Sequence, residues 1–165
     1  MTNNDLRCIS KFNDEVTIIS KNLNACILSP TIEYDYYNSI FDQLSVLSRD
    51  DWDLNKKSDY KFDIIVANNI LHYSRSPQLW IDNLMNSCDL LLVQDLMKRK
   101  RSDESEYGND GDSMRYSFDK YQYFDMSFNL SNLKYKITNS YIYDGDVNEY
   151  DKSPKHFISL ITHDT

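Results

Sequence analysis

Polar side chains stand directly after two apolar runs of this sequence. Asn68, Asn69 and His72 follow FDIIVA, and Asp95 follows LLLVQ. If both runs are strands of an open α/β sheet, these residues lie at strand carboxyl ends, where such sheets bind ligands. His72 or Asp95 would then be the general base of a catalyst. In the alternative interpretation, His72 only packs, and Asn68 and Asn69 satisfy backbone groups at the strand end.

A polar segment, residues 95–115, carries further candidate ligand-binding groups. Asp110 and Asp112 would accept hydrogen bonds from hydroxyls, and Arg115 would hold a carboxylate or a phosphate. This chemistry suits a small-molecule ligand such as an acidic or phosphorylated sugar. The acidic spacing of a calcium-binding loop is absent, so we expect no metal.

Strands and helices must position these groups, and their pattern predicts the fold class. Apolar runs of strand length occupy 6–12, 25–29, 44–48, 62–67 and 90–94. Segments with helical spacing separate most of them, which predicts a doubly wound, mostly parallel α/β sheet. The runs KITNSYIYD and KHFISLITHD predict an antiparallel pair of strands at one sheet edge. We expect one domain over 1–165, in which 95–115 is a long polar loop.

Composition and charge exclude several classes of partner. The formal net charge of −8 argues against nucleic acid, because its phosphates require a basic face. The sequence has neither a secretory signal nor 18 consecutive uncharged apolar residues, so we expect no membrane partner and a cytoplasmic protein. Its three cysteines read as buried free thiols. The aromatic residues of 121–128 cover the sheet or form a homo-oligomer contact, and the sequence leaves both open.

The segment KFDIIVANNILHYSRSPQLWIDNLM resembles class I S-adenosylmethionine-dependent methyltransferases. Small-molecule enzymes of that family share a Phe-Asp strand start, a polar turn, a Leu-His pair, a proline and an amphipathic helix at this spacing. The matching positions are Phe62-Asp63, Asn68-Asn69, Leu71-His72, Pro77 and Trp80. The resemblance implies a Rossmann-like sheet and S-adenosylmethionine as the cofactor.

The resemblance also assigns the cofactor-binding positions. With 6–12 as the first strand, the family's glycine-rich turn falls on 10–13, and the acid that binds ribose is replaced by Ser29. The acid near adenine corresponds to Asp50 or Asp51. The cofactor-binding candidates are therefore Ser10, Asn13, Ser29, Asp50, Asp51 and Asn68.

This cofactor site departs from the family pattern. No glycine occurs before Gly108, and Lys11 and Phe12 would fill a turn that the ligand must approach closely. Ser29 offers a neutral hydrogen bond where a carboxylate would form stronger charge-assisted ones. We therefore expect weak binding of S-adenosylmethionine or none.

Three functions follow, in order of preference. The first is a methyltransferase-like protein with an eroded cofactor loop, non-catalytic or binding an altered ligand, in bacterial sugar or polysaccharide metabolism. In it, Asn69, Asp110, Asp112 and Arg115 bind the ligand, and no cofactor is expected. The second is an active S-adenosylmethionine-dependent methyltransferase acting on a small molecule or sugar. The third is an oligomeric interaction module.

Overall fold

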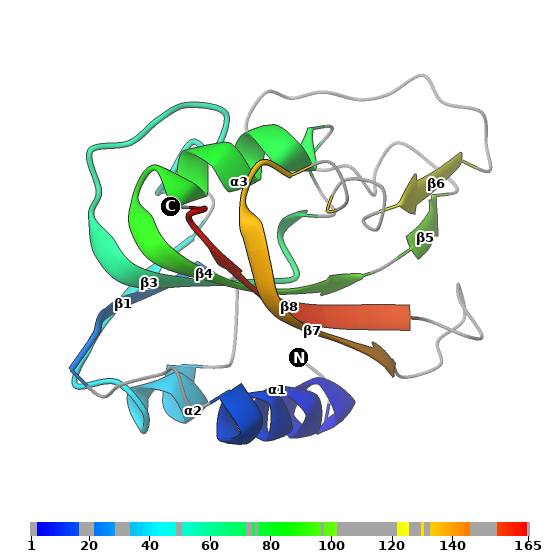
Figure 1. Ribbon diagram of the computed structural model, residues 1–165, viewed down its shortest axis with the longest axis horizontal. Helices are drawn as coiled ribbons and strands as arrows, with labels where there is room; N and C mark the ends of the chain where they lie inside the picture. Colours follow the sequence, from blue (N-terminus) through cyan, green and yellow to red (C-terminus); the bar gives the residue numbers. More distant parts are fainter. Residues whose placement is uncertain are drawn as a thin grey trace.

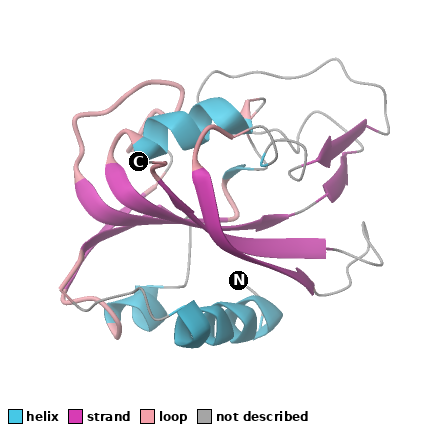
Figure 2. Ribbon diagram, in the orientation of Figure 1, coloured by secondary structure: helices cyan, strands magenta, loops and turns pink. Residues whose placement is uncertain are grey.

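We describe the protein from a computed structural model of the 165-residue chain. The described residues are 3–16, 22–28, 34–48, 51–71, 74, 76–96, 98–101, 122–125, 130, 133–145 and 155–164. A six-stranded sheet lies at the centre, and helices cover both of its faces (Figures 1 and 2).

The sheet consists of four parallel strands followed in space by two antiparallel ones. Its spatial order is β2-β1-β3-β4-β8-β7, where β8 runs antiparallel to both of its neighbours. The strands are β1 (Asn24–Leu28), β2 (Gln43–Leu47), β3 (Phe62–Asn68), β4 (Cys88–Leu96), β7 (Lys136–Asp144) and β8 (Lys155–Thr162). The predicted mostly parallel sheet and its antiparallel C-terminal pair are therefore confirmed.

The helices lie on opposite faces of this sheet, as a doubly wound fold requires. Figure 1 shows α3 (Pro77–Met85) on one face, and α1 (Asn3–Val16) and α2 (Tyr34–Asn38) on the other. No helix in the described part of the chain is long and apolar enough to span a bilayer.

Strand β3 links the two cores that these helices cover. Ile65 and Ala67 pack in a cluster with Trp80 of α3, whereas Ile64 and Val66 pack in the cluster beneath α1. Successive side chains of a strand point to opposite faces, so a strand covered on both faces reads as an unbroken apolar run. This explains the apolar run that predicted a strand at 62–67.

The predicted first strand at 6–12 is wrong, because these residues belong to α1. Ile9 and Phe12 are both buried, and their spacing of three places them on one helical face against the sheet. Asn13 lies inside α1 as well. The first strand of the sheet is therefore β1, and the strands predicted as second to fifth are β1 to β4.

A second correction concerns the predicted polar loop and the aromatic segment after it. Lys98–Arg101 form strand β5 and Gln122–Asp125 form strand β6, and these two pair antiparallel in a separate small sheet. The rest of the segment between them lies outside the described residues.

Candidate functional site

The carboxyl ends of the parallel strands form the edge where ligands of open α/β sheets bind. Strand β3 ends at Asn68, which is paired in register with Gln94 of β4. Asn69 follows immediately, and Asp95 follows Gln94. The structure thus brings three of the predicted site residues, Asn68, Asn69 and Asp95, to one edge of the sheet.

Asn68 is the most unusual polar side chain at this edge. Only 1% of its surface is exposed, yet neither Nδ2 nor Oδ1 has a hydrogen-bond partner within the described chain. No other described residue has two such buried atoms without a partner. It follows Ile64 and Val66 at two-residue spacing, so it belongs to the sheet face beneath α1 and α2. A buried polar group without a partner is costly, so this amide requires an explanation.

The turn after Asn68 is sharp and held at both ends. Asn69 adopts the left-handed conformation with φ of 53°, which asparagine tolerates better than most residues. Its backbone N–H donates to the carbonyl oxygen of Gln94 at 2.8 Å. The Leu71 N–H donates to Oδ2 of Asp95, also at 2.8 Å. The chain that leaves β3 is therefore fixed to the end of β4.

Asp95 is hydrogen-bonded to the backbone of the turn after β3. Its side chain is fully buried, and one carboxylate oxygen binds the Leu71 N–H. An acid in this position orients the turn that carries Asn69, which is a different task from the proton transfer considered in the sequence.

Asp51 stands just after β2, the strand beside β1. Its Oδ2 accepts hydrogen bonds from the Ser48 backbone N–H at 2.9 Å and from the Ser48 hydroxyl at 3.0 Å. These two bonds, the backbone one first, hold the pKa of Asp51 below its ordinary value. The carboxylate is therefore ionised at neutral pH and suited to accept a hydroxyl hydrogen bond.

Two predicted cofactor residues lie on a different element from the one expected. Ser10 and Asn13 are part of α1, and Asn13 Nδ2 donates to the Tyr36 hydroxyl of the α2 segment at 2.9 Å. Lys11 and Phe12 also belong to α1, so they cannot obstruct a turn after a strand. The predicted glycine-free turn at 10–13 is therefore wrong, because no such turn exists there.

The remaining predicted site residues lie outside the described residues. They are Ser29, Asp50, His72, Asp110, Asp112 and Arg115.

Sequence reasoning missed a polar contact that spans β4 and β7. Gln94 is fully buried, and its Nε2 donates to the Tyr143 hydroxyl at 2.7 Å and lies 3.4 Å from Nδ1 of His156. The signal in the sequence was a glutamine that ends the apolar run LLLV. Its partners lie 49 and 62 residues away, so pattern alone could not identify them.

Comparison with known proteins gives a fold. No protein-family model and no curated protein matches the sequence. Among solved structures, the chain resembles a putative methyltransferase from Bacillus halodurans C-125, with a TM-score of 0.61, 8% identity, and coverage of 94% of this chain and 98% of that one.

Two other solved structures are similar to this chain over most of its length. Coclaurine N-methyltransferase bound to N-methylheliamine and S-adenosylhomocysteine gives a TM-score of 0.58 at 7% identity, covering 96% of this chain and 70% of that one. Magnesium protoporphyrin IX methyltransferase from Synechocystis PCC 6803, with bound S-adenosylhomocysteine, gives 0.54 at 8% identity, covering 98% and 83%. The chain therefore has the class I methyltransferase-like fold, as the sequence predicted.

Proposed function

We propose that this chain is a methyltransferase-like protein that binds S-adenosylmethionine weakly at the carboxyl edge of its parallel strands, with the buried amide of Asn68 as an anchor. The class I methyltransferase-like fold supports this proposal, and structures that share the fold hold S-adenosylhomocysteine. A shared fold does not establish function, so the site residues must carry the argument.

The observation that carries the proposal is the amide of Asn68. Leaving a buried donor or acceptor without a partner costs about 1–3 kcal/mol, and Asn68 has one of each. Such a cost is tolerated at functional sites, where a ligand supplies the missing partners. The position of Asn68 at the end of β3 is where an open α/β sheet meets its ligand.

Two further features set the expected affinity. The sequence assigned Asp51 to the position near adenine. With β1 as the first strand, Asp51 instead follows the second strand, where the family resemblance places the acid that binds ribose. The sequence after β1, SPTIE, still contains no glycine. Without glycine, the backbone has less freedom to approach the ligand closely. One expected anchor is thus retained and one is missing, which favours weak binding.

The proposed role is ligand recognition, with methyl transfer low or lost. Asp95, one of the two predicted bases, has its carboxylate committed to the Leu71 N–H inside the protein. We therefore assign Asp95 to positioning the turn after β3. The sugar ligand predicted from Asp110, Asp112 and Arg115 depends on residues outside the described chain.

Calorimetric titration with S-adenosylhomocysteine tests the proposal. We expect saturable binding at millimolar ligand with a Kd weaker than about 10 μM, which corresponds to about 7 kcal/mol. Asn68→Leu should weaken binding at least about tenfold, or about 1.4 kcal/mol. The same change at Asn139, an exposed residue of β7, is the matched control and should leave the Kd unchanged.

Three results would contradict the proposal. Absence of binding at millimolar ligand would show that S-adenosylmethionine is not a ligand of this protein. If the Asn68→Leu variant binds with the same Kd as the wild type, Asn68 does not contribute to binding the ligand. A Kd tighter than about 10 μM would show that the segment after β1 needs no glycine for ordinary affinity.

A further inference from the structure

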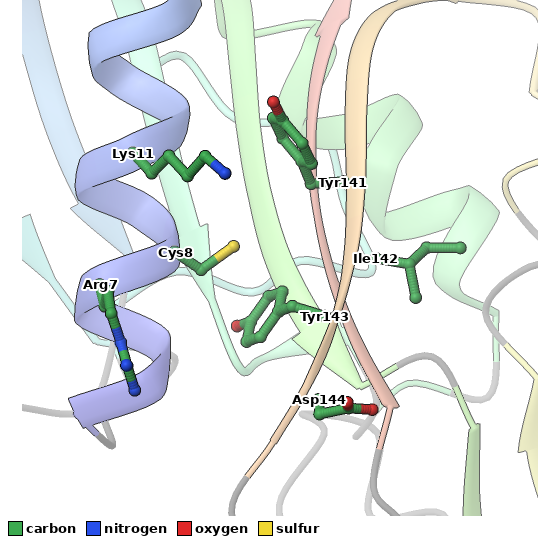
Figure 3. Close-up of a pocket in the computed structure, with 7 residues that line it drawn as sticks. All are labelled: Arg7, Cys8, Lys11, Tyr141, Ile142, Tyr143 and Asp144. Atoms are coloured by element: carbon green, nitrogen blue, oxygen red, sulfur yellow. The ribbon is translucent and has the colours of Figure 1, made fainter.

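A separate cavity of about 400 Å³ lies between α1 and the edge strand β7. Figure 3 shows its lining residues, which are Arg7, Cys8, Lys11, Tyr141, Ile142, Tyr143 and Asp144. Its volume falls within the range of small-molecule sites, about 300–1,000 Å³. None of these residues belongs to the S-adenosylmethionine site proposed above.

The β7 residues that line the cavity lie near the same sheet edge as that site. Strands β4 and β7 both run antiparallel to β8, so β7 ends at the edge where β4 ends. Gln94 joins the two regions, because its backbone carbonyl accepts from Asn69 and its side chain donates to the Tyr143 hydroxyl. A single residue, Gln94, therefore connects the cavity to the turn after β3.

Two tyrosines of β7 form an aromatic wall. Tyr141 and Tyr143 are two residues apart, so both face α1, and Tyr141 packs edge-on against Phe12 with ring centroids 5.9 Å apart. Tyr143 is held by Gln94 and lies beside the His156 ring at 5.5 Å. These contacts fix the rings before any ligand arrives, which lowers the entropic cost of binding.

The opposite wall, on α1, is cationic. Arg7 and Lys11 are four residues apart and so share a helix face, and Lys11 Nζ lies 5.9 Å from the centre of the Tyr141 ring. In Figure 3, Cys8 and Lys11 point from α1 toward β7, whereas Ile142 points away from the helix. The one carboxylate of the lining, Asp144, forms an ion pair with Lys155.

We propose that this cavity binds a small aromatic carboxylate, with its ring against Tyr141 and Tyr143 and its carboxylate on the α1 side, which carries Lys11 and Arg7. Aromatic faces recognise a planar ring, and guanidinium and ammonium groups recognise a carboxylate. The protein has a formal charge of −8, so a surface that carries two cations beside two tyrosines is unusual for it. This local positive charge favours an anionic aromatic ligand at the cavity.

Cys8 provides a direct reporter of occupancy. It lines the cavity and is partly exposed, whereas Cys26 and Cys88 are buried, and burial raises the pKa of each of these two thiols to about 12. At pH about 8, an alkylating reagent should therefore modify Cys8 well before the other two. The Cys8→Ser variant establishes the background rate.

The probes are benzoate, benzamide and acetate, each added to the full chain without S-adenosylmethionine. Benzoate at about 10 mM should slow alkylation of Cys8 about tenfold if its Kd is on the order of 1 mM. Benzamide keeps the ring without the charge and acetate keeps the charge without the ring, so neither should protect. Arg7→Gln and Lys11→Gln should each reduce protection by benzoate, and Lys136→Gln at the other end of β7 should not.

The proposal is overturned if benzoate gives no protection, if benzamide protects equally, or if the Arg7 and Lys11 variants are both protected like the wild type. These results are independent of S-adenosylhomocysteine binding, so failure here leaves the proposed function standing.

Discussion

Two buried asparagines make opposite use of the same side chain. Asn83 of α3 is 3% exposed, and its Nδ2 donates to the Leu54 carbonyl oxygen at 2.8 Å. Asn68 at the end of β3 is 1% exposed, and both of its polar atoms lack a partner among the described residues. Burial alone therefore does not distinguish a structural amide from one that awaits a ligand. Hydrogen-bond satisfaction does.

The surroundings of the two residues differ in the same way. Beside Asn83, Trp80 is buried, and its Nε1 donates to Asn55 Oδ1 at 2.9 Å, so α3 is joined to segment 54–55 by two hydrogen bonds. Beside Asn68, the chain turns through the left-handed Asn69 at the carboxyl edge of the parallel strands. In the first region the two side chains are hydrogen-bonded, whereas in the second the two polar atoms of Asn68 have no partner in the described part of the chain.

The largest effect is expected from the complete region. Trp80→Ala removes a side chain that is 1% exposed and its hydrogen bond to Asn55, so the free energy of unfolding should fall by about 3–5 kcal/mol. Urea unfolding measures this loss. A loss below about 1 kcal/mol would mean that α3 is not packed as described.

The next effect concerns the satisfied amide. Asn83→Leu leaves the Leu54 carbonyl without its donor, and we expect the free energy of unfolding to fall by about 1–3 kcal/mol. The same urea experiment applies. Unchanged stability would show that this hydrogen bond makes no net contribution to the free energy of unfolding. Asn83 could then no longer serve as the reference for Asn68.

Asn68→Leu should act in the opposite direction. Leucine has a similar size and removes two polar atoms that have no partner among the residues that the structure describes, so the ligand-free protein should become more stable by about 1 kcal/mol. The change is measured beside Asn83→Leu under identical conditions. Destabilisation by Asn68→Leu would indicate that its amide is satisfied in solution.

The smallest effect is expected at Asp51, whose polar contacts at this edge are satisfied. Ser48 lowers the folded-state pKa of Asp51, so the contact stabilises the protein above the unfolded pKa of about 3.9. That contribution is lost as pH falls through the folded pKa. The stability difference between wild type and Asp51→Asn should therefore shrink with acidification below pH about 4. A difference that is constant across this range would contradict the assigned contact.

The sequence predicted the elements whose patterns are local and failed where two periods overlap. The run 64–67 is apolar on both faces, as a central strand is, and the short apolar run of β8 is likewise bounded by polar residues. Residues 6–12 contain Leu6, Cys8 and Phe12 at even spacing, which imitates a strand. The buried pair Ile9 and Phe12 has helical spacing, and packing against the sheet favours the helix.

The candidate site was predictable only in part for a related reason. Position at a strand end identified Asn68, Asn69 and Asp95, because the end of a strand is visible in the sequence. The lack of partners at Asn68 and the contact between Gln94 and Tyr143 depend on residues brought together by folding. No sequence pattern reports either of them.

The most direct test measures unfolding of wild type, Asn68→Leu and Asn83→Leu with and without S-adenosylhomocysteine. At about ten times the Kd, the ligand should raise the free energy of unfolding of wild type and Asn83→Leu by about 1.4 kcal/mol each. Asn68→Leu should start above wild type and gain no more than about 0.4 kcal/mol from the same ligand concentration, because its Kd is at least about tenfold weaker. If Asn68→Leu instead starts below wild type and gains the same increment, Asn68 is not the anchor of the site.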